Sequence, residues 1–160
     1  MKRYVKAVNI ISILIMVTAL IYIAWSWNTM PSRIAGHYNL YGEIDAYGDK
    51  SSVLELVVGM VFAYTAFLYM KKRAKTWRFS LCVATDRNSS LGIVLQAMLT
   101  TMQLFVMAGL MLMVIYAIKI SNLPSWFTLI LACGLVVPMV VIFAYVVVSI
   151  WREYYGNQKI

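Results

Sequence analysis

Charged side chains are scarce in this chain of 160 residues. They make up 12% of the sequence, whereas soluble globular domains carry about 25%, and hydrophobic residues reach 62% with a mean hydropathy of +0.78. Such a composition excludes an ordinary soluble domain and predicts an integral membrane protein. The net charge of +8 does not suggest nucleic acid here, because in a membrane protein the positions of basic residues matter more than their sum.

Cysteine is nearly absent, and common catalytic and metal-binding motifs are missing. Cys82 and Cys133 are too few and too far apart for a disulfide framework or a cysteine metal site. The sequence contains no HExxH, EF-hand or GxSxG pattern, no low-complexity segment and no convincing internal repeat. We therefore expect a protein that is not an enzyme and needs no cofactor.

Long apolar runs account for most of the chain. A helix needs about 20 apolar residues to cross a hydrocarbon core of roughly 30 Å. Four such runs cover residues 5–27, 53–70, 91–117 and 125–150. They predict an all-α fold, a four-helix membrane bundle forming one domain over residues 1–160. The first run is too long for a signal peptide and lacks a small-residue cleavage site, so we expect it to be retained.

The basic residues are distributed unevenly between the two sides of the predicted membrane. One side would carry Arg33, Lys50 and Lys119 alone. The other would carry Lys2, Arg3, Lys6, Lys71, Lys72, Arg73, Lys75, Arg78, Arg87, Arg152 and Lys159. Because cytoplasmic segments are enriched in Lys and Arg, we expect a multi-pass protein of the cell membrane with both termini in the cytoplasm. Loop 28–52 would then be extracellular, and loop 71–90 cytoplasmic.

The cytoplasmic loop is the most basic segment. We expect its cluster to contact anionic lipid headgroups, which attract juxtamembrane Lys and Arg residues. A cytoplasmic regulator or a transporter subunit is an alternative partner for the same surface. The cluster consists of Lys71, Lys72, Arg73, Lys75 and Arg78.

Polar residues recur at helical spacing within two of the predicted spans. Asn9 and Ser12 share a stripe of the first helix, and Gln96, Thr100 and Gln103 lie on one face of the third. Buried polar side chains in a membrane need hydrogen-bond partners on neighbouring helices. We expect these faces to pack within the bundle, and they are equally compatible with a monomer and a homodimer.

The extracellular loop holds the only histidine and three of the six acidic residues, and Glu55 lies just beyond it. Its turns should be compact and ordered, with Gly42 and Gly48 at positions suited to positive φ. Glu55 follows in a Ser52-Val53-Leu54-Glu55 capping pattern. Capping accounts for a glutamate at this position, and a functional role for its carboxylate stays open. The candidate binding residues are Arg33, His37, Tyr38, Asn39, Tyr41, Glu43, Asp45, Asp49, Lys50 and Glu55.

Three interpretations of this loop compete. His37, Glu43 and Asp45 offer an imidazole and carboxylates to a divalent metal, although their spacing matches no known motif. His37 could act as a general base, although no nucleophile lies beside it in the sequence. We favour a structural network that supports a recognition surface, with Asp45 or Asp49 pairing with Arg33 or Lys50.

The loop contains an ordered series of residues: Pro31, Ile34, His37, Asn39, Gly42, Glu43, Asp45, Gly48 and Lys50. This order resembles the N-terminal domain, of unknown function, in the SdpI family of Gram-positive immunity proteins. Ala35 stands where the family usually has proline. Proteins of this family protect the producing cell from its own secreted, membrane-active toxin peptide, and some relay the presence of toxin to a cytoplasmic repressor.

The resemblance implies a bacteriocin immunity or toxin-resistance protein that binds a peptide through the His37 loop, and this is our first hypothesis. A second hypothesis is an accessory or sensor subunit of a peptide exporter or regulatory system. A third is a metal-dependent membrane enzyme built on His37, Glu43 and Asp45.

Overall fold

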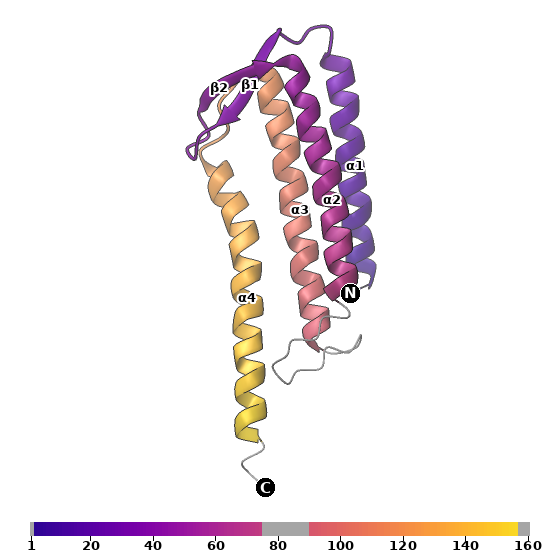
Figure 1. Cartoon of the computed structure of the whole chain (residues 1–160), viewed down its shortest axis with the longest axis vertical. Coiled ribbons are helices and arrows are strands. Elements are labelled where there is room, and N and C mark those ends of the chain that lie inside the picture. The colour runs from indigo at the N-terminus through magenta and orange to yellow at the C-terminus, as the bar shows by residue number, and fades with distance from the viewer. Residues whose placement is uncertain (1, 75–89, 157–160) are drawn as a thin grey trace.

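The computed structural model describes residues 2–74 and 90–156, and it is mostly helical (Figure 1). Two strands and a short 3-10 helix interrupt the helices once. In chain order the elements are α1 (Lys2–Ser26), β1 (Arg33–Tyr38), β2 (Ile44–Asp49), η1 (Lys50–Ser52), α2 (Val53–Ala74), α3 (Ser90–Lys119) and α4 (Trp126–Gly156).

Four helices are long and apolar enough to cross a membrane, which confirms the predicted fold class and a multi-pass membrane protein. The helices extend beyond the apolar runs at several ends. Helix α2 continues through Lys71 to Ala74, and α4 continues to Gly156. Hydropathy marks where the apolar residues stop, but Lys and Arg are good helix formers, so the helix itself need not stop there.

Helices α1, α2 and α3 pack together, and α4 packs chiefly along α3 (Figure 1). In the figure α4 begins lower than the upper ends of the other three helices and runs past the lower end of α3. Only a small part of the α4 span is buried within the protein. Most of its apolar side chains therefore face outward, as expected for a helix in contact with lipid.

The upper end of the α1–α3 bundle is closed by an antiparallel hairpin of β1 and β2, and we call this the hairpin end. Ile34 and Ala35 of β1 are 1% and 4% exposed and belong to one core with Val53, Val114 and Ala117 from α2 and α3. The hairpin thus belongs to the folded core and is not a separate appendage.

The predicted loop was expected to consist of turns, and the structure corrects this by placing two strands in it. The pairing register skips Gly36 on β1 and Asp45 on β2. Gly36 lies so close to β2 that a Cβ there would come within 2.7 Å of the Gly48 backbone nitrogen. Gly42 has the predicted positive φ, at 83°, but Gly48 does not, because it lies within β2.

Close packing of α3 against α4 depends on Gly134. A Cβ at this position would come within 2.2 Å of the Phe105 ring, whereas a Cβ at Gly59 of α2 would meet nothing within 4 Å. The two glycines therefore form a matched pair of helical positions, one tightly packed and one open.

We predict that Gly134→Ala destabilises the protein by about 1–3 kcal/mol, because overpacking forces neighbouring groups to move. The control Gly59→Ala should be neutral or stabilising by up to about 1 kcal/mol, because alanine favours helix more than glycine does. Thermal unfolding of both purified variants in detergent checks this. Equal midpoints for the two variants would contradict the close approach of Gly134 to Phe105.

Candidate functional site

Asn39 organises the tip of the hairpin. Its side-chain oxygen accepts hydrogen bonds from the backbone nitrogens of Tyr41 (2.9 Å) and Glu43 (3.0 Å), and its amide nitrogen donates to the Glu43 carboxylate (3.0 Å). Its backbone also bonds to Glu43 and Gly42. Asparagine is suited to this role because its short side chain bonds to the backbone a few residues further on. The tip is therefore held in one conformation.

The hairpin is hydrogen bonded to the connection between α3 and α4. The Leu123 nitrogen donates to the Gly42 carbonyl (2.7 Å), and the Ile44 nitrogen donates to the Asn122 side chain (3.0 Å). A Cβ on Gly42 would lie 2.9 Å from the Leu123 carbonyl oxygen, so the contact requires glycine as much as the turn does. Segments far apart in the chain thus form one surface at the hairpin end.

Tyr38 contributes a third bond to the same connection. Its hydroxyl donates to the Ser121 carbonyl at 3.2 Å, and its ring is half-buried against the core. Burial raises the pKa of Tyr38 to about 12, because an anionic phenolate is poorly solvated there. Tyr38 was a predicted binding residue, and the structure shows it half-buried, with its hydroxyl bonded to the α3–α4 connection.

His37 and Asp45 form the polar centre of the exposed hairpin face. The His37 Nδ1 lies 2.6 Å from the Asp45 carboxylate, with the two side chains 69% and 43% exposed. Asp45 has no register partner on β1 and lies between Ile44 and Ala46, which pair with Tyr38 and His37. This position brings its carboxylate next to the His37 ring. The prediction was that Asp45 or Asp49 pairs with Arg33 or Lys50, and for Asp45 the structure shows a histidine partner instead.

The remaining hairpin candidates are spread over the surface. Lys50 lies over the Trp27 ring at 4.7 Å from its centroid, a cation–π contact at the top of α1. Arg33 and Asp49 are register partners across the two strands, and both are exposed. Glu55 is exposed in the first turn of α2.

The three residues of the metal hypothesis are not brought together as a set. His37 and Asp45 are in contact, but the Glu43 carboxylate bonds to Asn39. Within residues 2–74 and 90–156 no group of three or more His, Cys, Asp or Glu side chains is placed to hold a metal ion. The geometry therefore gives no support to a metal centre built from His37, Glu43 and Asp45.

A second polar cluster lies deep between α1, α2 and α3. The Lys71 amine donates to the Asn9 side chain at 2.6 Å and to the Gln103 side-chain oxygen, and Gln103 donates onward to Ser12 at 2.8 Å. Ser12 and Gln103 are fully buried, and Lys71 is 5% exposed. We call these four residues the Lys71 network. It links three helices by side-chain hydrogen bonds.

The network confirms that the Asn9–Ser12 and Gln103 stripes pack within the bundle, but it corrects the prediction for Lys71. That residue was expected to contact lipid headgroups, and its burial removes it from any such surface. The long aliphatic stem of lysine lets the amine reach inward from the end of a helix. The sequence carried one signal for this arrangement, the polar stripes of α1 and α3. The side-chain oxygens of Asn9 and Gln103 need a hydrogen-bond donor within the bundle.

The structure describes two of the other four basic candidates. Lys72 and Arg73 are exposed near the end of α2, and the Arg73 guanidinium bonds to the Tyr69 hydroxyl at 3.1 Å. Lys75 and Arg78 lie outside the described residues. A surface contact with lipid or with a partner therefore stays a prediction for this cluster, now without Lys71.

The hairpin is also the part of the chain that matches a known family. A family model described as a domain of unknown function (DUF1648) matches residues 14–62. This segment includes the second half of α1, both strands and the beginning of α2. No curated protein and no solved structure matches the chain. The match thus includes all of β1 and β2, and it assigns no activity.

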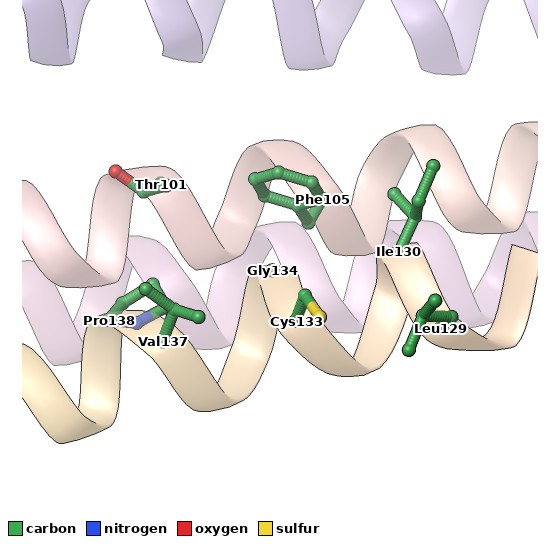
Figure 2. A pocket seen from close by; sticks show the side chains of 8 residues that line it. All are labelled: Thr101, Phe105, Leu129, Ile130, Cys133, Gly134, Val137 and Pro138. Atoms are coloured by element: carbon green, nitrogen blue, oxygen red, sulfur yellow. The ribbon is translucent and has the colours of Figure 1, made fainter. Parts of the chain in front are cut away.

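A groove of about 420 Å³ lies between α3 and α4 (Figure 2). Its lining is Thr101, Phe105, Leu129, Ile130, Cys133, Gly134, Val137 and Pro138. The Thr101 hydroxyl is already bonded to the Ala97 carbonyl and the Tyr4 hydroxyl, each at 3.0 Å. The groove is therefore apolar in character, and we assign it no chemistry.

We predict that Tyr38 ionises with a midpoint near pH 12 in the folded protein. The Tyr38 contribution to stability is fully present below pH 10, the ordinary pKa, and is lost as pH rises through 12, because a phenolate cannot donate to Ser121. The difference in tyrosinate absorbance between wild type and Tyr38→Phe during an alkaline titration measures this. A difference curve centred near 10 would show that Tyr38 is not buried.

We predict that Gln103→Leu destabilises the protein by about 1–3 kcal/mol, because it leaves the buried Lys71 amine short of an acceptor. Lys71→Met should cost less, because it leaves neutral amide oxygens without a donor, which is less unfavourable than burying an amine without an acceptor, and it keeps the volume of the side chain. Unfolding midpoints in the same detergent compare the two variants. Equal losses would show that the Lys71 network is not arranged as described.

Proposed function

We propose that this chain is a membrane immunity protein of the SdpI type, which resides in the cell membrane and protects the cell by binding a membrane-active peptide at its hairpin end. Support comes from the family match, which includes all the residues, from Pro31 to Lys50, that carry the resemblance. The proposal assigns recognition to the hairpin and does not require a bound metal or a chemical reaction.

The observation that carries the proposal is the set of exposed side chains on the two paired strands, His37 on β1 and Asp45 and Tyr47 on β2, which we call the hairpin face. His37 and Asp45 are in contact, and Tyr47, two residues after Asp45 on the same strand, is 61% exposed. A tyrosine surrounded by hydrogen-bonding groups is the usual composition of an energetically important protein contact. The face therefore offers a peptide an aromatic anchor together with an imidazole and a carboxylate.

Rigidity makes this face suitable for binding. The hairpin is fixed from below by Ile34 and Ala35, at its tip by Asn39, and at its side by Asn122 and Leu123. A surface that is already ordered loses little conformational entropy when a ligand binds. The same surface lies where the spans end, so a peptide attacking the membrane would arrive beside it.

We predict that His37→Ala and Asp45→Asn each reduce protection of a toxin-sensitive Gram-positive strain against graded doses of an Sdp-like peptide. A loss of about tenfold in the tolerated dose corresponds to about 1.4 kcal/mol of binding free energy. Both side chains are exposed, so folding should be unaffected. Survival at equal membrane expression is the measurement.

Lys72→Ala is the matched control, because it removes an exposed charge at the opposite end of α2 and should leave protection unchanged. Binding of labelled peptide to the purified protein in nanodiscs separates recognition from expression effects. Absence of protection and of binding by the wild type, across several membrane-active peptides, would refute the proposal. Wild-type protection in all the variants would move recognition away from the hairpin face.

A further inference from the structure

The tip of the hairpin exposes two adjacent apolar side chains that the recognition face does not use. Leu40 is 82% exposed and Tyr41 is 81% exposed, among the highest values for large hydrophobic residues in the described chain. Single exposed apolar residues are common on protein surfaces, but adjacent pairs of large ones at a turn tip indicate a contact.

This exposure is imposed by the backbone. Leu40 and Tyr41 are the central residues of the turn that runs from Asn39 to Gly42, and the Gly42 nitrogen donates to the Asn39 carbonyl at 3.0 Å. The Asn39 side-chain oxygen also accepts hydrogen bonds from the backbone nitrogens of Tyr41 and Glu43. These bonds fix the backbone of the turn, from which both apolar side chains project outward.

The position of the tip identifies what it contacts. Gly42 is hydrogen bonded to Leu123, three residues before Trp126 opens α4 with a 49% exposed indole. Figure 1 shows the tip lying against the side of the molecule, next to the chain that leads into α4, and not projecting beyond the hairpin end. Tryptophan and tyrosine at the ends of membrane spans lie at the level of the lipid headgroups.

We propose that Leu40 and Tyr41 insert into the lipid interface beside the beginning of α4 and anchor the hairpin to the membrane. Leucine supplies an apolar side chain for the acyl boundary, and tyrosine places its hydroxyl among the headgroups. The nearby Glu43 carboxylate is held at the base of the turn by Asn39, at 3.0 Å. The outer surface of the lipid-facing α4 thus continues onto the hairpin tip.

Anchoring of the tip has a consequence for the rest of the hairpin. With Leu40 and Tyr41 in the interface, the strands extend from the bilayer edge across the bundle end, and the exposed Tyr47 lies on the part that faces water. The tip therefore contacts lipid, whereas the face that carries the His37–Asp45 pair is left free to bind a ligand.

The test uses single-cysteine proteins in phosphatidylcholine nanodiscs. Cys82 and Cys133 are changed to serine, and Leu40→Cys or the control Tyr47→Cys is labelled with an environment-sensitive fluorophore. We expect lipids carrying a nitroxide on the acyl chain to quench the label at position 40 several-fold more than the label at 47. Aqueous iodide should quench in the opposite order. Both positions are exposed, so neither change should prevent folding, and circular dichroism checks this.

Equal access of iodide to positions 40 and 47 in lipid would overturn the anchor. So would shielding of position 40 that appears only when a peptide or protein is added, since the tip would then bind a macromolecule. The experiment requires neither toxin nor cell survival, so its result is independent of the immunity function.

Discussion

The docking of β1 onto the end of α3 determines what the hairpin can present. Ile34 and Ala35 are the residues that bury it, and once they are seated, the two skipped register positions fix which side chains point away. The His37–Asp45 pair lies at these positions, because Asp45 is itself skipped and His37 follows the skipped Gly36. In a membrane bundle, where lipid competes with apolar helix contacts, such an end contact also orders the helices it covers.

The Lys71 network performs a comparable function toward the opposite end of the same three helices. A hydrogen-bonded lysine between two amide side chains admits few alternative packings, because every other arrangement leaves a polar group without a partner. Helices α1, α2 and α3 are therefore held by specific contacts at two levels. Helix α4 packs mainly on α3 through apolar groups and Gly134.

The sequence was sufficient for the four spans because hydropathy reports directly on the cost of placing side chains in lipid. It was insufficient for β1 and β2, since their glycines, aspartates and asparagine favour turns and the skipped residues Gly36 and Asp45 disturb any two-residue alternation. The polar stripes indicated that Asn9 and Gln103 need hydrogen-bond partners, but neither Lys71 as their donor nor His37 as the partner of Asp45 could be predicted. These residues become neighbours only through tertiary packing.

Three hydrogen bonds between residues 121–123 and the hairpin attach the beginning of α4 to the hairpin. If α4 slides along α3, it disturbs the close packing of Gly134 on Phe105 and, through its N-terminal connection, also pulls on Gly42, Ile44 and Tyr38. A displacement of this one helix therefore also strains the hairpin.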